Sequence, residues 1–310
     1  MEFFHKKTNF PFMATRRVWY TISAVLMIVC FVSFAMRGLN FAIDFTGGIG
    51  IEASLSKPAD IEQIRSVVIA ANYHEPQITT LTTVRDVQIR LQPTDEKTEV
   101  LRPKFEALLK SVDPGAQITK LEVVGPQVGN ELRNAAMVSL AMTLALIGLY
   151  IFFRFHTWRL SLGAILAVMH DPILVLGVFS ITKTPFDLPV VAAVLAVIGY
   201  SLNDTVIVFD RIRENFERNR RQAPEVTLDQ AINQTLSRTI MTKVVTSIVV
   251  VALLLLGGSA LRGFSEALLI GILAGTYSSI YISSSVALSC GLKAEHLFPT
   301  ERKDPIDQLP

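Results

Sequence analysis

The sequence has few cysteines, few charged residues and little net charge. Its 310 residues include two cysteines, 18% charged residues and a formal net charge of +2. Two cysteines are too few for a disulfide framework. We interpret Cys30 and Cys290, which both lie in apolar stretches, as packing residues. So small a net charge gives no indication of a nucleic-acid partner.

Motifs of the common hydrolytic enzymes are also missing. The chain has no G-x-x-x-x-G-K-[ST] loop, which excludes ATP hydrolysis by that route. It has no G-x-S-x-G, no H-E-x-x-H and no cluster of His and Cys, so serine hydrolases and zinc enzymes lack their signatures here. We therefore expect neither an enzyme nor a bound metal or other cofactor.

Apolar residues, in contrast, are abundant. Half of the chain is hydrophobic and the mean hydropathy is +0.42, which is too high for an ordinary soluble domain of this size. A membrane-crossing helix needs about 20 predominantly apolar residues. Six stretches qualify and predict six transmembrane helices: 18–36, 134–153, 160–182, 188–209, 244–261 and 267–292.

Residues 37–133, between the first and second spans, have the composition of a soluble domain. They contain 11 Lys/Arg and 13 Asp/Glu. Periodicity predicts, in order, a strand, a helix, two strands, a helix and a strand: 48–55, 59–71, 77–83, 87–91, 98–109 and 116–124. This βαββαβ order predicts an α+β ferredoxin-like domain. The predicted fold class is an α-helical polytopic membrane protein with this domain between helices 1 and 2.

Basic residues are distributed unequally between the predicted loops. Sixteen Lys/Arg lie in 1–17, 154–159, 210–243 and 293–310. The opposite short loops hold only Lys183 and Arg262. Because basic loops stay in the cytoplasm, we predict that both termini are cytoplasmic and that the domain at 37–133 is external.

The predicted cytoplasmic segment 210–243 has a helical pattern of its own. Thr227 stands three residues before Gln230, which is a capping-box spacing. We expect an amphipathic helix that begins there, carries Arg238 and Thr242 to the membrane surface, and continues into the fifth span.

Asp204, within GYSLNDTVIVFDRIREN at 199–215, is the sharpest candidate for function. A carboxylate inside a span costs about 2.5–3.5 kcal/mol on insertion scales. Tyr200 and Ser201 precede it by four and three residues and share its helix face, and Asn203 adjoins it. Such a carboxylate can take up and pass on a proton. The alternative is an acid that is hydrogen-bonded for packing or hydrated near the membrane edge.

Arg238, just before the fifth span, is the natural partner for Asp204. A basic side chain at that position can also extend along the helix to the membrane–water interface and have no role beyond marking it. Thr242 follows one turn later and could prolong a polar path, but it is equally consistent with a surface threonine. Both interpretations stay open for both residues.

The third span carries His170 and Asp171 at its centre. Two ionisable groups there are costly unless they face other helices or water. Structural pairing with a neighbouring helix and a proton relay are both consistent with the pattern. The sixth span has Gly271-x-x-x-Gly275, which we interpret as helix packing.

The segment NFAIDFTGG follows the first span at 40–48. Asp44, Gly47 and Gly48 are typical of a turn that leads into the first strand. Taken alone the segment is a linker, with no metal-ligand spacing and no phosphate loop.

Four motifs together resemble the SecF family of bacterial protein-export subunits. They are NFAIDFTGG, AVMHDPIL, GYSLNDTVIVFDRIREN and QTLSRT. The resemblance covers essentially the whole chain and its six-span order. Pro172 departs from the family pattern, in which an aliphatic residue is expected. The resemblance implies the resistance–nodulation–division superfamily of proton-driven machines and a location in the bacterial inner (cytoplasmic) membrane.

The resemblance also implies partners and roles. The partners are SecD in a heterodimer, the SecY–SecE–SecG channel, SecA, translocating preproteins and membrane lipid. The implied function is use of the proton-motive force for late, SecA-ATP-independent steps of export. The implied proton relay consists of Asp204, Arg238 and Thr242.

Three other functions compete with this one. A small-molecule or lipid antiporter of the same superfamily is the main alternative, although one small external domain and six spans argue against it. An intramembrane aspartyl protease lacks its Y-D and G-x-G-D motifs here. A purely structural scaffold for SecD is distinguished from proton work by the substitution Asp204→Asn.

Overall fold

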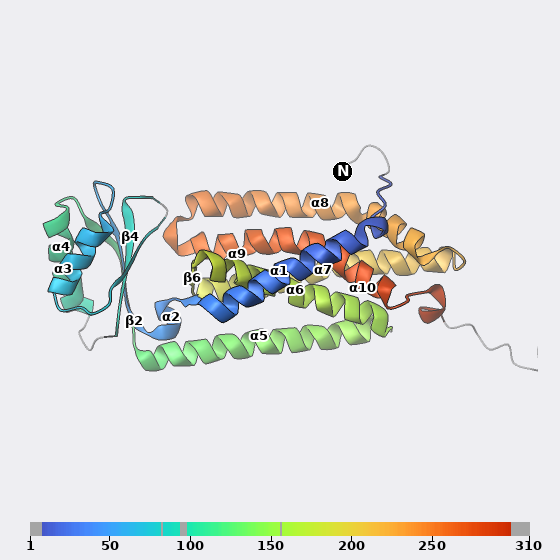
Figure 1. Ribbon diagram of the computed structural model, residues 1–310, viewed down its shortest axis with the longest axis horizontal. Helices are drawn as coiled ribbons and strands as arrows, with labels where there is room; N and C mark the ends of the chain where they lie inside the picture. Colours follow the sequence, from blue (N-terminus) through green and yellow to red (C-terminus); the bar gives the residue numbers. More distant parts are fainter. Residues whose placement is uncertain (1–7, 82, 94–97, 156, 299–310) are drawn as a thin grey trace, which may run out of the picture.

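The computed structural model describes residues 8–81, 83–93, 98–155 and 157–298. In this part of the chain, six helices are long and apolar enough to cross a membrane. A four-stranded sheet with two helices forms a smaller domain at one end of the helix bundle (Figure 1). These features confirm the predicted fold class. Lys6, Lys7, Arg302 and Lys303, which contribute to the predicted orientation, lie outside the described residues.

The smaller domain has the predicted βαββαβ order. Its elements are β2 (Gly48–Ser54), α3 (Ile61–Ala70), β3 (Gln77–Thr80), β4 (Asp86–Leu91), α4 (Thr98–Val112) and β5 (Gln117–Val124). The sheet order is β3-β4-β2-β5 and every pairing is antiparallel, which is the ferredoxin-like arrangement. Strand β4 alternates buried and half-buried residues, because one face of the sheet packs on the two helices.

The bundle consists of helices that differ greatly in burial. They are α1 (Arg16–Arg37), α5 (Pro126–Arg154), α6 (Trp158–Thr182), α7 (Leu188–Arg218), α8 (Pro224–Leu256) and α9 (Gly258–Tyr277). A π-helical turn, Ser278–Ile282, continues α9 into α10 (Ser283–Ser289). The spans formed by α6, by α7 and by α9 with α10 are 50–61% buried, whereas those of α1, α5 and α8 are 6–17% buried. The first group therefore forms the interior of the bundle.

Several helices extend beyond the predicted spans. Helix α5 already begins at Pro126, and α7 continues to Arg218. Helix α8 begins at Pro224 with Ala223 as its N-cap, and the Thr227 hydroxyl donates back to the Ala223 carbonyl. The predicted capping box was therefore wrong. A proline in the first helical position is pre-organised for helix and so sets the start.

The predicted cytoplasmic segments gather at one end of the bundle. The start of α1, the α7–α8 turn and the end of α10 lie opposite the smaller domain (Figure 1). The chain before α1 is held on α8: the Phe10 amide donates to Asn233 Oδ1 at 2.9 Å, and the Met13 amide donates to Asp229 Oδ1 at 2.8 Å. The side of the membrane on which this end lies stays a prediction.

Candidate functional site

Asp204 faces the interior of the bundle from α7. It is 3% exposed, and its Oδ2 lies 2.7 Å from Nζ of Lys243, a residue of α8 that is 5% exposed. The same Nζ lies 4.1 Å from the centre of the Tyr200 ring. A carboxylate, an ammonium group and an aromatic ring therefore meet between α7 and α8. The Asp204–Lys243 pair is neutral as a whole, and this offsets part of the free-energy cost of desolvating each charge.

The ion-pair partner of Asp204 differs from the predicted one. Arg238 is exposed and makes no ion pair with Asp204; its charge acts from further away than that of Lys243. The two basic residues are five positions apart, which is about 140° around a helix. Only one of them can face α7. Because the buried stripe of α8 runs through Thr235 and Thr239, that residue is Lys243.

Tyr200 and Thr242 contribute to the same interface. The Tyr200 hydroxyl donates to the Thr242 carbonyl at 3.0 Å and lies 2.7 Å from the Thr246 hydroxyl. The Thr242 hydroxyl donates to the Thr239 carbonyl within its own helix. Tyr200 thus fixes α7 to α8 on one side of Lys243, and Thr242 takes part through its backbone.

Two other residues expected near Asp204 face elsewhere. Asn203 is exposed on the outer surface of α7. The Ser201 hydroxyl is buried and donates to Asp171 of α6. The prediction that Ser201 serves Asp204 therefore does not match the geometry, because a three-residue offset also allows contact with the neighbouring helix.

Asp171 forms a second buried site with its own partners. Its carboxylate is 0% exposed and accepts hydrogen bonds from Ser201 and, at 2.8 Å, from Ser278 in the π-helical turn. His170 Nδ1 lies 3.1 Å from Asp171 Oδ1, and His170 Nε2 lies 3.4 Å from the Ser23 hydroxyl of α1. This site joins α1, α6, α7 and the turn after α9. The geometry agrees with the helix-pairing interpretation, and a relay role stays a prediction.

The two glycines of the sixth span lie against α7. A Cβ on Gly271 would be 2.1 Å from Val197 Cγ2, and a Cβ on Gly275 would be 3.1 Å from the Ser201 hydroxyl oxygen. Small residues at these positions allow the close approach of α9 to α7. This agrees with the packing interpretation of the motif.

The NFAIDFTGG segment is a docked structure and not a free linker. Asn40–Phe41 (β1) pairs in parallel with Pro185–Phe186 (β6), and Ile43–Thr46 forms the short helix α2. Asp44 Oδ2 accepts the Leu188 amide at 3.0 Å, at the start of α7. The turn prediction missed this contact because its partner lies 144 residues away.

Gly47 and Gly48 are required by this docking. Their φ angles are +70° and +127°, values that residues with a Cβ rarely adopt. A Cβ on Gly47 would be 2.9 Å from Pro126 Cα, and one on Gly48 would be 2.4 Å from the Leu91 carbonyl oxygen. The chain therefore passes directly between the start of α5 and the end of β4.

The junction between domain and bundle contains half-buried charged side chains. Asp187, the N-cap of α7, accepts the Val190 amide at 2.9 Å. Burial raises the pKa of Asp187, and the charge of Asp44 raises this pKa further. Arg90 of β4 donates to Asn40 Oδ1 at 3.3 Å, and burial lowers the pKa of Arg90. The sheet of the domain is thus connected to the start of α7 through a few polar contacts.

Comparison with known proteins identifies the family. The chain matches the family model "Protein export membrane protein SecD/SecF, C-terminal" over residues 104–293 and the "SecD/SecF GG Motif" over residues 32–59. It is 42% identical to protein translocase subunit SecF of Haemophilus influenzae over 98% of its length and 94% of that protein. The chain belongs to the SecF family. Among other SecF relatives, that of Pseudomonas aeruginosa is 42% identical over 96% of this chain and 97% of that protein.

Two solved structures of the larger SecDF protein resemble this chain. The crystal structure of SecDF from Thermus thermophilus, described as a translocon-associated membrane protein, superposes with a TM-score of 0.84 and 35% identity. A second structure, SecDF in a super-membrane-facing form, gives a TM-score of 0.68. The present SecF-family chain covers 39% of each of those chains. The range matched by the SecD/SecF GG Motif, 32–59, contains Gly47 and Gly48, so the docked segment lies within a motif of the family.

Lys243 is the site residue that the sequence did not single out. It directly precedes the uncharged stretch 244–261 and was therefore counted among the cytoplasmic loop charges. A signal was present: spacings of four from Ala231 through Thr235 and Thr239 lead to Lys243 on the buried face. In the described part of the chain, no group of three or more His, Cys, Asp or Glu side chains could hold a metal ion.

Proposed function

We propose that this SecF-family subunit works with SecD beside the SecY–SecE–SecG channel in the bacterial inner membrane. There it uses the proton-motive force to drive late steps of preprotein export that do not depend on ATP hydrolysis by SecA. The observation that supports this most is Asp204, a carboxylate buried within a span and paired with a charge from the next helix. Proton uptake at such a site changes the charge of a helix–helix interface by one.

The available energy is sufficient for a conformational step. One proton crossing the membrane yields about 2.3 kcal/mol per 100 mV. A few protons per cycle can therefore bias two states that differ by a few kcal/mol. No bound cofactor is needed, because the gradient supplies the energy.

The relay is completed outside this chain. Arg238 and Thr242 lie on the exposed side of α8, where a helix of SecD would cover them. SecD would also contribute an acidic residue that completes the proton relay. The similarity to SecDF chains, of which this chain covers 39%, supports such a partnership.

Movement at Asp204 can reach the external domain through α7. Leu188, at the start of this helix, donates its amide to Asp44. The sixteen residues between Leu188 and Asp204 span about 24 Å of continuous helix. A shift of α7 would therefore act on the docked NFAIDFTGG segment and on the sheet that follows it.

The substitution Asp204→Asn tests this function. The variant is reconstituted with SecD, SecY–SecE–SecG and SecA, and completion of a stalled preprotein intermediate is measured with and without an imposed proton gradient. We expect normal assembly and loss of the stimulation by the gradient. Glu217→Gln, an exposed acid on the same helix, is the control.

Two results would contradict the proposal. One is full stimulation of export by the gradient in the Asp204→Asn complex, which would leave a scaffold role. The other is proton flux that depends on a small ligand and needs no preprotein, which would favour the antiporter.

A further inference from the structure

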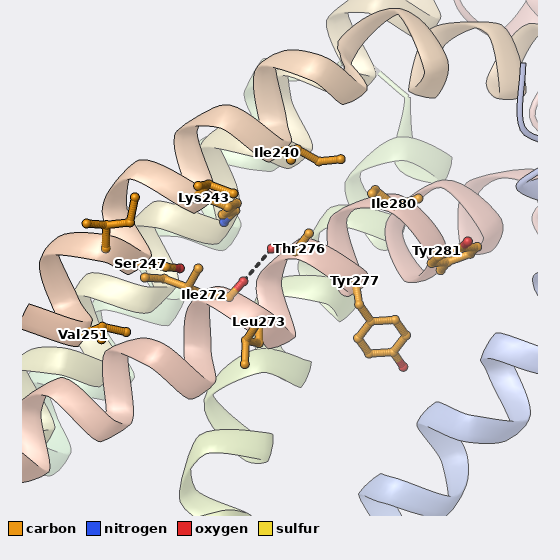
Figure 2. A pocket seen from close by; sticks show the side chains of 12 residues that line it. Ile240, Lys243, Ser247, Val251, Ile272, Leu273, Thr276, Tyr277, Ile280 and Tyr281 are labelled. Atoms are coloured by element: carbon orange, nitrogen blue, oxygen red, sulfur yellow. Dashed lines mark hydrogen bonds between the residues drawn. The ribbon is translucent and has the colours of Figure 1, made fainter. Parts of the chain in front are cut away.

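A groove lies directly beside the Asp204–Lys243 pair. It runs between α8 and α9, continues along the π-helical turn, and has a volume of about 620 Å³. Figure 2 shows Lys243 and Ser247 on α8 and Thr276 on α9 along its walls. Most of the lining is apolar, and Lys243 is the charged residue in it. The same ammonium group thus borders both Asp204 and the groove.

The contact between the two charges has no further hydrogen bonds to support it. The Oδ2–Nζ distance is 2.7 Å. Within the described residues, neither Asp204 Oδ2 nor Lys243 Nζ has another hydrogen-bond partner. The pair therefore depends on this one contact and on the Tyr200 ring, and it weakens as soon as one charge is lost.

We propose that Lys243 is the internal counter-ion of Asp204, and that a proton bound by Asp204 displaces the Lys243 ammonium into the groove between α8 and α9. The inference rests on the proposed function, since it assumes proton uptake at Asp204. The proton comes from water and binds a carboxylate oxygen of Asp204, and the pair changes from neutral to a net charge of +1. A buried, uncompensated ammonium is costly, and the flexible four-carbon stem of lysine allows it to move.

The groove provides a destination for the displaced group. Ser247 and Thr276 present hydroxyl groups in its walls, and hydroxyl oxygens can accept hydrogen bonds from an ammonium. When Lys243 leaves the α7–α8 interface, the attraction between these helices at Asp204 disappears. Loss of one buried charge pair then permits α7 to shift relative to α8.

The other ionisable groups around Asp204 are less suited to this role. Arg238 of α8 acts from a distance, and Tyr200 on α7 contributes its ring to Lys243. On α6, Asp171 with His170 faces α7 through Ser201 and has its own hydroxyl donors. Lys243 is thus the group whose position depends directly on the charge of Asp204.

Infrared spectroscopy of the full chain in lipid nanodiscs tests the counter-ion role. The carbonyl band of the protonated Asp204 carboxyl, assigned by its loss in Asp204→Asn, is followed against pH. In Lys243→Met we expect the midpoint of this band to move upward by at least about one pH unit, a tenfold gain in proton affinity. Lys243→Arg keeps the positive charge and should retain a midpoint near that of the wild type. Arg238→Met should shift the midpoint less than Lys243→Met.

Nitrogen NMR of lysine-labelled protein tests the displacement. The Lys243 ammonium signal, assigned by its loss in Lys243→Met, should change as the Asp204 band appears. An unchanged midpoint in Lys243→Met, a larger shift in Arg238→Met, or a Lys243 signal that does not change would each overturn the inference. These spectra need no export assay. If the spectral changes appear as expected while the proton gradient still stimulates export by the Asp204→Asn complex, the proposed function fails and the counter-ion role stands.

Discussion

Two buried carboxylates, Asp171 of α6 and Asp204 of α7, have contrasting environments. Asp171 accepts hydrogen bonds from the hydroxyls of Ser201 and Ser278 and has His170 beside it, so several neighbours hold its carboxylate in place. Asp204 has one cationic partner, Lys243, and its Oδ2 has no other hydrogen-bond partner among the described residues. A carboxylate surrounded by donors is fixed in place, whereas one that depends on a single charge can change its contacts when it is protonated.

This difference predicts that substitutions at Asp171 act on stability. In Asp171→Asn the hydroxyls of Ser201 and Ser278 can still find partners, because an amide offers both an acceptor and donors. In Asp171→Ala the Ser201 hydroxyl loses its acceptor, and the Ser278 hydroxyl keeps only the Gly275 carbonyl at 3.4 Å. Each unsatisfied buried group costs about 1–3 kcal/mol. We expect Asp171→Ala to lower the thermal unfolding midpoint in detergent clearly more than Asp171→Asn. Equal losses would show that the hydroxyl contacts contribute little.

At the scale of elements, α7 connects the two parts of the molecule. Its first turn is bound by Asp44 and Asp187, its middle carries Asp204, and its last turns continue past the predicted span 188–209 to Arg218. Aspartate at the N-cap satisfies a free amide of the first turn. The same aspartate is half-buried near another carboxylate, and its desolvation together with the charge of Asp44 raises its pKa above the ordinary value.

The start of α7 therefore predicts a defined pH dependence. The folded pKa of Asp187 is raised, so from about pH 4 upward the folded state binds more protons than the unfolded state. The Asp187 contribution to stability is then greatest at low pH and falls as the pH rises through the folded pKa. Asp187→Asn keeps an N-cap and should abolish this part of the pH dependence. Asp187→Ala abolishes it too but also loses the cap, so it should be about 0.5–2 kcal/mol less stable than Asp187→Asn at all pH values.

Unfolding midpoints measured from pH 4 upward check this prediction. The Asp187→Asn protein should be at least as stable as the wild type at neutral pH. A lower neutral stability for Asp187→Asn, with an unchanged pH slope, would show that the ionised carboxylate is favourable at this position.

At the scale of the whole molecule, local patterns predicted the elements but not how the helices face each other. The six spans and the βαββαβ order follow from hydrophobic runs and periodicity, which belong to single segments. The Asp204–Lys243 contact depends on how α7 and α8 rotate about their axes, and the Asp44–Leu188 contact joins residues 144 positions apart. Arg238 was the more conspicuous basic residue, but its position five residues before Lys243 turns it to the outside of the bundle.

The arrangement of the ends of the bundle leads to a prediction of topology. The start of α1 with Arg16 and Arg17, the α7–α8 turn and the end of α10 lie at one end, and the smaller domain lies at the other (Figure 1). Because basic short loops stay in the cytoplasm, residues of the domain should be external and residues of the α7–α8 turn internal. Single cysteines at Glu62 of α3 and Asn219 of the turn, both exposed, report these two ends.

The labelling experiment starts from a chain in which Cys30 and Cys290 are replaced by alanine, since these are the two native cysteines. A membrane-impermeant maleimide is added to cells whose inner membrane is intact. We expect Glu62→Cys to react at once and Asn219→Cys to react only after the inner membrane is disrupted. Because the two positions belong to opposite ends of one bundle, the reverse pattern would place the domain in the cytoplasm. The domain could then not act on preproteins that emerge on the outer side, and the proposed role in late export would fail with it.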